Sequence, residues 1–402
     1  MLASLSDKQL RVRIQAEKFF CISVALFPIL DSYAIPGIPL NLSLVVYGMA
    51  VLFLLVGNYR WSICSNPFLP LIAYIAITPL LMWCFPERSI YSYSPESVLL
   101  RYGKLLVCLL VFYVFGAWRS VDRPFLYRVM RAVVYVASAL ILIQQVAYLF
   151  GIVIPNPLSL FSVSEAYYVD NYTMGAGNLF RPSAFFLEPS HMTFYFVLFL
   201  SYALFGEHRD GVVHFRSALI ASAGILLSGS GMGFVLVFII WFLVGFMKAR
   251  NHALYLGALV GVVVVLVFLM QTAYFQQVAD RFLSNDVMGG NAIQARLGNG
   301  LEVFTDKTFL ACFFGSGYGN TTTDTYYNGL TFLLCSLGIV GLFVTCITLI
   351  RIFRRGKLFE RVVVLMYACV LCFAQIFATP YLLLYGAFLI CTPAWMEDDK
   401  NL

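Results

Sequence analysis

The chain has 402 residues, of which 61% are hydrophobic and 11% are charged, and its formal net charge is +6. Soluble domains carry about 25% charged residues, so this composition excludes an ordinary soluble protein and indicates an all-α, polytopic integral membrane protein. In such a protein the excess of positive charge reports topology, and it gives no reason to expect nucleic acid as a partner.

Apolar runs of about twenty residues predict about 12 transmembrane helices in a single transmembrane domain, residues 1–402. The N-terminus is basic and leads into the first apolar run without a small-residue cleavage site, so we expect a retained first span and no signal peptide. The predicted spans are 19–35, 39–57, 67–85, 98–118, 129–151, 190–206, 214–229, 231–247, 253–271, 327–350, 361–379 and 381–395.

The orientation follows from the distribution of basic residues, which favours cytoplasmic loops. With the N-terminus in the cytoplasm, most of the 26 lysines and arginines fall in inside segments. The outside segments hold only Arg88, Arg181, Arg281, Arg296 and Lys307. We therefore expect both termini in the cytoplasm and two long periplasmic loops, 152–189 and 272–326.

The first long loop ends in Asn178-Leu-Phe-Arg-Pro-Ser-Ala-Phe-Phe-Leu-Glu-Pro-Ser-His191, where a polar loop becomes an apolar helix. Pro189 suits the first turn of a helix, and an arginine beside a helix N-terminus is typical of an anion site. Arg181 is thus a candidate for binding phosphate, although a local ion pair with Glu188 is the alternative. His191 follows Glu188 by three residues and is either a catalytic group or a structural donor.

The second long loop contains Arg281 and Arg296, and Arg296 opens a predicted amphipathic helix, Arg-Leu-Gly-Asn-Gly-Leu-Glu-Val-Phe. A glycine-rich turn, Gly315-Ser-Gly-Tyr-Gly-Asn320, follows. Glycines let the backbone approach a ligand closely, but the same pattern also occurs in plain turns.

Arg101 and Lys104 lie one turn apart at the start of the predicted fourth span. Cations inside a span usually face the protein interior or a wet cavity, and the alternative is snorkelling to the outer headgroups. Two further runs have simpler interpretations. The run 227–233 is typical of helix packing or a tight turn, and the basic residues 351–357 are typical of a topology signal.

The ten cysteines show neither a metal-binding spacing nor a disulfide framework, because most of them lie inside apolar runs. We therefore predict that the protein needs no metal and no cofactor.

The segment Phe180-Arg-Pro-Ser-Ala-Phe-Phe-Leu-Glu-Pro-Ser190 resembles the loop-to-helix entry of bacterial O-antigen and capsule polymerases of the Wzy type. Arg296, the run Phe314-Gly-Ser-Gly-Tyr-Gly-Asn320 and the pair Tyr327-Asn328 resemble the second large periplasmic loop of the same superfamily, followed by Gly338-Ile-Val-Gly341 in the next span. The resemblance covers the chain in topology and about forty residues in motif.

O-antigen ligases share this architecture and carry a His-Asn or similar pair, nine residues, and then Gly-x-x-Gly. Asn328, residues 329–337 and Gly338 to Gly341 keep that spacing, but Tyr327 stands where the ligase histidine would be. This departure favours a polymerase over a ligase.

The resemblance implies an inner-membrane glycosyltransferase of lipopolysaccharide or capsule biosynthesis. It would transfer a growing glycan from undecaprenyl pyrophosphate to an incoming lipid-linked repeat unit at the periplasmic face. Its partners would be undecaprenyl-pyrophosphate-linked oligosaccharides and membrane lipids, and a chain-length regulator is left open.

The leaving pyrophosphate is a stable anion, so the reaction needs positioning and charge stabilisation. We assign Arg181 and Arg296 to the pyrophosphate and Glu188 to the acceptor hydroxyl as a base, with Tyr327 and His191 as lesser catalytic candidates. The other expected substrate-binding residues are Arg281, Arg101, Lys104, Tyr318 and Asn328. The alternatives are an O-antigen ligase joining glycan to the lipid A core and a flippase for lipid-linked oligosaccharides. The sugars, the linkage and the stereochemical outcome stay open.

Overall fold

The computed structural model is mostly helical, with one two-stranded ribbon among the residues that it describes. These residues are 7–36, 40–57, 59, 61, 65–80, 95–158, 160–163, 180–208, 213–248, 299–320, 327–372 and 381–391, with only the backbone described for 95–101. A helix lies in every predicted span except 253–271, which is outside the described residues.

By their internal contacts the residues form two compact units. Unit 1 comprises Met1–Met130, Phe161–Tyr167 and Arg296–Leu402, and unit 2 comprises Arg131–Leu160 and Tyr168–Ala295.

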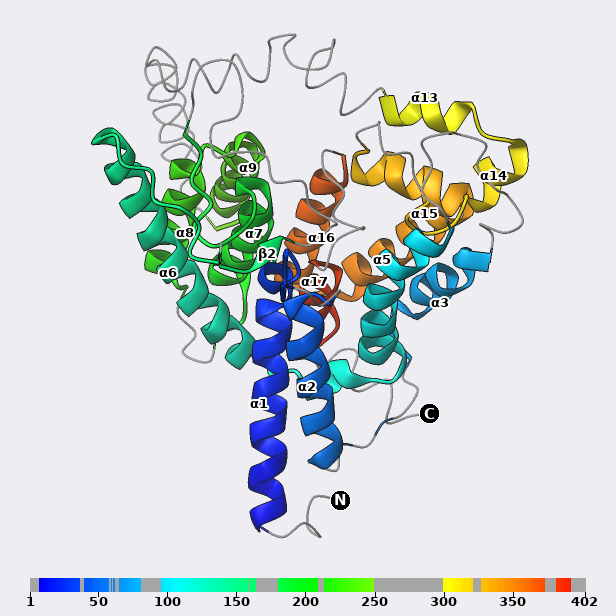
Figure 1. Ribbon diagram of the computed structural model, residues 1–402, viewed down its shortest axis with the longest axis horizontal. Coiled ribbons are helices and arrows are strands. Elements are labelled where there is room, and N and C mark those ends of the chain that lie inside the picture. Colours follow the sequence, from blue (N-terminus) through cyan, green and yellow to red (C-terminus); the bar gives the residue numbers. More distant parts are fainter. Residues whose placement is uncertain are drawn as a thin grey trace. The chain divides into compact units, whose positions relative to one another are not determined.

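The first half of unit 1 begins with α1 and α2, which pack side by side (Figure 1). Its elements are α1 (Asp7–Leu30), β1 (Tyr33–Ala34), α2 (Leu42–Val56), α3 (Leu69–Ile77), η1 (Thr78–Leu80), α5 (Pro95–Leu109), η2 (Leu110–Val114), η3 (Ala117–Ser120) and the first turns of α6 (Arg123–Leu149). The helix α1 starts twelve residues before the predicted span at 19–35, because polar residues continue a helix beyond the apolar segment that hydropathy detects.

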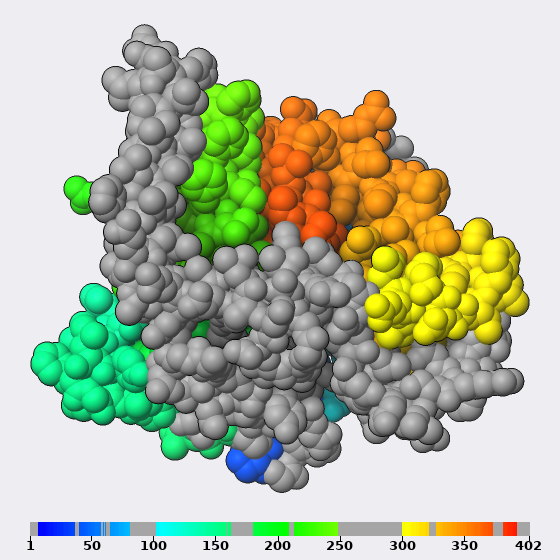
Figure 2. Space-filling model, turned by 90° about the horizontal axis from the view of Figure 1, so that it is seen from above, coloured from blue at the N-terminus to red at the C-terminus, as the bar shows by residue number. Residues whose placement is uncertain are grey.

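The second half of unit 1 is built around α15. Its elements are β2 (Ser162–Val163), α13 (Asn299–Thr305), α14 (Phe309–Phe314), α15 (Gly329–Arg355), α16 (Leu358–Leu371) and α17 (Tyr381–Ile390). The helix α13 confirms that the segment predicted to follow Arg296 is helical, whereas α14 and the antiparallel β1–β2 ribbon were not expected from the sequence. Figure 2 shows α13 and α14 lying along α15.

The helix α15 is broken at Gly338, where φ is 67° and ψ is −172°. This backbone conformation is essentially restricted to glycine, since any side chain would clash with its own backbone. The predicted span 327–350 is therefore two helical pieces, and the break lies where the sequence has Gly338-Ile-Val-Gly341.

Unit 2 is a bundle of α7 (Pro189–Phe205), α8 (Phe215–Leu227) and α9 (Gly231–Lys248) together with the later part of α6 (Figure 1). Every residue of α7 except Ser190 and His191 is buried, so this helix forms the core of the bundle. The predicted division between 214–229 and 231–247 is present as a tight turn at Gly229, whose φ is 62°.

Two of the described helices, Arg123–Leu149 and Gly329–Arg355, are long and apolar enough to cross a membrane. Seven shorter apolar segments of 10–17 residues accompany them, among them Leu42–Val56, Pro189–Phe205 and Tyr381–Ile390. The helical fold class is thus confirmed by the structure.

Candidate functional site

In unit 2, the segment 180–188 packs as a fixed stretch of chain that leads into α7. The ring of Phe180 stacks on Tyr148 of α6, with centroids 4.4 Å apart and planes 10° apart. The buried ring of Phe186 contacts Tyr195 and Phe196 of α7 at 5.5 and 6.2 Å between centroids. These aromatic contacts hold both ends of the segment against the bundle.

Hydrogen bonds fix the backbone between these two rings. The Ser183 hydroxyl and the Asn156 amide both donate to the Phe186 carbonyl, at 2.7 and 3.1 Å. The backbone N–H of Ala184 donates to Oε1 of Gln144, a buried side chain of α6, at 3.2 Å. The Ser183 bond closes a local turn, and the bonds from Asn156 and Gln144 tie that turn to residues 30 and 40 positions earlier in the chain, so the segment has little freedom to rearrange.

Ala184 has a φ of 54°, and it is the only non-glycine residue with a positive φ in the part of the chain that the structure describes. The left-handed conformation costs a residue with a Cβ about 1–2 kcal/mol. Such strain persists only where the surroundings enforce it, and it concentrates at functional sites. The strained residue lies between the two candidate residues Arg181 and Glu188.

Arg181 is half-buried, and its Nε donates to the Gly229 carbonyl at 3.3 Å. Gly229 belongs to the turn between α8 and α9, so the guanidinium ties the segment to that turn. This bond to the backbone fixes the direction of the arginine side chain. A fixed direction is what a residue needs in order to hold an anion in one position.

Glu188 is exposed and occupies the position just before α7, with extended backbone angles. The Ser190 hydroxyl donates to its Oε2 at 2.7 Å. A carboxylate at this position already interacts favourably with the positive end of the helix. The carboxylate of Glu188 thus already lies at the N-terminus of α7, where a bound anion was expected. The expectation of an anion site therefore rests on Arg181 alone. His191 lies half-buried in the first turn of the same helix.

In unit 1, the predicted residues near the start of α15 are part of the packed interior. Asn328 caps α15, because its Oδ1 accepts hydrogen bonds from the backbone N–H of Thr331 at 2.8 Å and from the Thr331 hydroxyl at 3.0 Å. Tyr327 is buried beside it. The side chain of Tyr318 is buried between Tyr102 and Phe332, in edge-to-face contacts of 5.4 and 5.8 Å. These positions have structural roles in the described part of the chain.

The glycine-rich turn approaches the broken helix α15 closely. A Cβ at Gly315 would meet the Leu337 backbone at 2.6 Å, and Gly315 and Gly317 both have positive φ. The N–H groups of Ser316 and Gly317 donate to the carbonyls of Cys335 and Ser336 at 3.1 and 3.0 Å. The glycines that were predicted to let the backbone approach a ligand instead let the turn at 315–317 approach the backbone of α15.

Lys307 adds a side-chain hydrogen bond to the glycine-rich turn. Its Nζ donates to the Ser316 hydroxyl at 2.8 Å. Burial lowers the pKa of Lys307 from its ordinary value, and the neighbouring thiols of Cys335 and Cys312 act in the opposite direction. The sequence placed Lys307 only among the outside charges and gave no signal for this role.

The remaining cationic candidates are distributed as follows. Lys104 is half-buried in α5, one helical turn after Arg101, of which the structure describes the backbone. Arg281 and Arg296 lie outside the described residues. Arg181, Glu188 and His191 belong to unit 2, and Lys104, Tyr318, Tyr327 and Asn328 belong to unit 1.

Gln144 and Asn156 were missed by the sequence analysis, although both are buried polar side chains that position the segment 180–188. A glutamine inside an apolar helix is the one signal that could have pointed to Gln144, since such a residue needs a buried partner. Within the described residues, no three His, Cys, Asp or Glu side chains gather as a metal site would require.

The chain matches no protein-family model, and no curated protein or solved structure matches it either.

Proposed function

We propose that the protein is a polytopic membrane glycosyltransferase that polymerises lipid-linked repeat units of O-antigen or capsule, with Arg181 and Glu188 at its reaction centre. The observation that carries the proposal is the strained segment 180–188. It is the stretch that resembles the Wzy-type polymerases, and its hydrogen bonds fix a cation at one end and an exposed carboxylate at the other.

The membrane part of the proposal rests on the surface of the helices as well as on their length. Large apolar side chains point outward from helices of both units, as lipid-facing positions do. They include Leu52, Phe53 and Val56 of α2, Leu142, Ile143 and Val146 of α6, and Phe343 and Ile350 of α15. Together with the apolar runs of the sequence, these surfaces favour about 12 spans.

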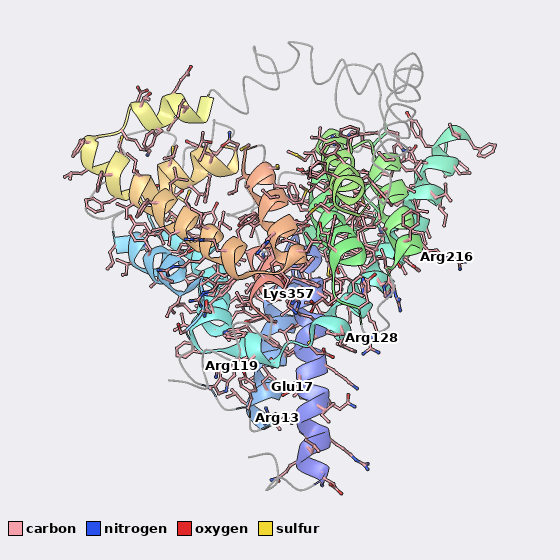
Figure 3. All side chains as sticks on the ribbon, turned by 180° about the vertical axis from the view of Figure 1, so that it is seen from behind. Arg13, Glu17, Arg119, Arg128, Arg216 and Lys357 are labelled. Carbon is pink, nitrogen blue, oxygen red and sulfur yellow. The ribbon has the colours of Figure 1, made fainter. Side chains whose placement is uncertain are left out.

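The charges of unit 1 favour a cytoplasmic N-terminus. Arg13 and Arg119 lie toward the end of the unit where α1 begins, away from α13 and α14 (Figure 3). The last turn of α15 carries Arg354 and Arg355. Under the positive-inside rule these ends face the cytoplasm, and the start of α15 faces the periplasm.

In the proposed reaction, an acceptor hydroxyl of the incoming repeat unit attacks the anomeric carbon of the growing glycan. The bond from that carbon to the pyrophosphate oxygen breaks, and the electron pair leaves with the undecaprenyl pyrophosphate. Glu188 accepts the hydroxyl proton, for which its exposed carboxylate is suited. Arg181 stabilises the negative charge on the pyrophosphate, since a guanidinium binds phosphate oxygens in a bidentate manner.

The break in α15 is the feature that favours the alternative of a transporter, because transporters use discontinuous helices to hold substrate ions. Here the carbonyls at the break accept hydrogen bonds from Ser316, Gly317 and Tyr74. These bonds give the carbonyls at the break partners within the protein, so the break needs no bound ion to satisfy them, and the transferase remains the preferred function. Tyr327, at the position of the ligase histidine, argues against a ligase.

The test is a glycan ladder from a deletion strain complemented with full-length variants. We expect wild type to restore long polymer on the lipid A core, and Arg181→Gln and Glu188→Gln to leave single repeat units. Matched controls are Arg216→Gln and Glu207→Gln, which change exposed residues of unit 2 outside the segment and should restore the ladder. Equal amounts of each variant in the membrane fraction must be verified by immunoblot.

Normal ladders from both Arg181→Gln and Glu188→Gln would overturn the assignment of these residues. Long polymer that stays on the lipid carrier in the deletion strain, and never reaches the core, would show a ligase instead.

A further inference from the structure

The short helix α14 exposes most of its large apolar side chains. Phe309, Leu310, Phe313 and Phe314 are 81%, 49%, 41% and 38% exposed, respectively. The rings of Phe309 and Phe313 lie parallel with centroids 6.3 Å apart, and those of Phe313 and Phe314 are in edge contact at 5.2 Å. Only Ala311 of this helix is buried, toward the unit. A contiguous aromatic surface of this kind is rare in contact with water and usually marks an interaction site.

This surface is continuous with the apolar outer faces of α15 and α3. The Phe313 backbone lies against Gly338, one residue before the exposed Ile339. The Tyr74 hydroxyl of α3 is placed to donate to the carbonyls of Phe314 and Leu337, at 2.8 and 3.1 Å. Exposed Ile77 follows Tyr74 in the same helix. The surfaces of α3, α14 and α15 therefore meet at the break in α15.

The position of the break along α15 limits the depth at which α14 ends. From Gly329 to Gly338 there are nine helical steps, which correspond to roughly 14 Å at 1.5 Å per residue. The two pieces of α15 do not share one axis (Figure 1), so this length is the greatest depth that the break can have below the start of the helix. With that start at the outer surface of a hydrocarbon core of about 30 Å, the break and the C-terminal end of α14 beside it stay within the outer half of the core.

The backbone of this region meets the requirement for such a location. Non-helical backbone at membrane depth is tolerated only where protein groups satisfy its polar atoms. At the break, the Cys335 and Ser336 carbonyls accept from the N–H groups of Ser316 and Gly317, and the Leu337 carbonyl accepts from Tyr74. The Lys307–Ser316 bond holds the turn in the same place.

We propose that α14 and the turn at 315–317 form a re-entrant element, which dips into the outer leaflet with Phe309, Leu310, Phe313 and Phe314 against the acyl chains of bilayer phospholipids. The inference rests on the membrane part of the proposed function and is independent of its chemistry. The second long outer loop therefore has a membrane-inserted part in addition to any part in the periplasm. Aromatic side chains are suited to this level of the bilayer, where they contact both headgroups and chains.

The experiment places the photo-crosslinker p-benzoylphenylalanine in the full-length protein, in liposomes of phosphatidylcholine with radiolabelled acyl chains. Single variants carry it at Phe309, Phe313, Phe343 or Glu302. Phe343 of α15 is the control for a lipid-facing span, and the exposed Glu302 of α13 is the control for the same probe in water. We expect lipid adducts at 309 and 313 within about threefold of those at 343, and about tenfold or more above those at 302.

The outcomes separate the two hypotheses. If the probe at 343 forms lipid adducts, but the probes at 309 and 313 form no more than the probe at 302, the re-entrant element is overturned and the membrane assignment stands. Labelling at none of 309, 313 and 343 would overturn both.

Discussion

The side chain of Gln144 accepts a hydrogen bond from the backbone N–H of Ala184 at 3.2 Å, in a segment where Ala184 holds a φ of 54°. Both residues are buried. A glutamine from the last third of α6 thus enforces a backbone conformation that alanine avoids. Arg181 lies three residues before Ala184, and α7 begins five residues after it, at Pro189.

The first prediction concerns this bond. Gln144→Leu leaves the N–H of Ala184 buried without its acceptor, which costs about 1–3 kcal/mol. We expect a lower thermal midpoint in detergent and shorter polymer in the complementation assay, because the segment holding Arg181 loosens.

Gln145→Leu is the matched control. Its side chain donates to the Leu227 carbonyl at 2.7 Å, outside the segment 180–188. This variant should lose an exposed hydrogen bond of the same residue type, with a smaller cost in stability, and keep the glycan ladder. A normal ladder from Gln144→Leu, at a clearly lowered thermal midpoint, would mean that the segment needs no such positioning.

The second prediction uses the strain at Ala184 itself. Glycine adopts a positive φ without the Cβ penalty, so Ala184→Gly removes strain of about 1–2 kcal/mol while it adds chain entropy to the unfolded state. We expect little net change in the thermal midpoint. In contrast, Ala184→Val places a β-branched side chain in a buried left-handed position and should prevent stable folding.

The readout is the fraction of monodisperse protein in fluorescence-detected size-exclusion chromatography after heating. Equal stability of the valine and glycine variants would show that the backbone at this position is not left-handed.

The third prediction tests the break in α15. Gly338→Ala introduces a Cβ that meets the carbonyl carbon of Phe313 at 2.7 Å, and the backbone conformation alone disfavours it by about 1–3 kcal/mol. We expect a strong loss of folded protein. Gly103→Ala in α5 is the control, because its Cβ has no atom within 4 Å. That variant should gain a few tenths to about 1 kcal/mol from helix propensity, so the two substitutions should shift the thermal midpoint in opposite directions.

The fourth prediction concerns a buried ion pair in unit 1. Arg123 Nη2 and Glu360 Oε1 are 2.8 Å apart, and their side chains are 15% and 4% exposed. The guanidinium also lies 5.1 Å from the centre of the Phe359 ring. Removing one partner leaves a buried charge, so Arg123→Met or Glu360→Leu should each cost about 3–5 kcal/mol.

The double variant Arg123→Met/Glu360→Leu should recover most of this loss, since neither charge then remains buried. The measurement is the thermal midpoint of all four proteins in the cycle. Additive losses in the double variant would indicate that the two side chains do not form this pair.

The sequence predicted the helices well because hydropathy alone determines where apolar runs lie. Even the short turn at Gly229 was located, since glycines and serines interrupt an apolar run there. The start of α1 at Asp7 was not predicted, because a helix can continue through polar residues with no change in its hydrogen bonds. The helix α14 was also missed, since six residues are too few to show a helical period.

The candidate site was predicted in part. Arg181 and Glu188 were identified from their residue types and from the proline that starts α7, and the structure gives each a defined setting. Tyr318, Tyr327 and Asn328 were chosen by the same kind of reasoning, and they are packed or capping residues in unit 1. The type of a residue does not reveal whether its polar atoms form hydrogen bonds with residues distant in the sequence.

The sequence by itself determined a helical chain of very low charge and the positions of most of its helices. These properties follow from composition and from the local period of apolar residues. Only the tertiary structure decided that Gln144 fixes Ala184, that the glycine-rich turn completes a broken α15, and that α14 presents its phenylalanines outward. Each of these depends on contacts between residues distant in the sequence. In the first two a buried polar group has to find a partner, and in the third the packing of α14 on α15 decides which face of the short helix is covered; no local pattern in the sequence encodes either.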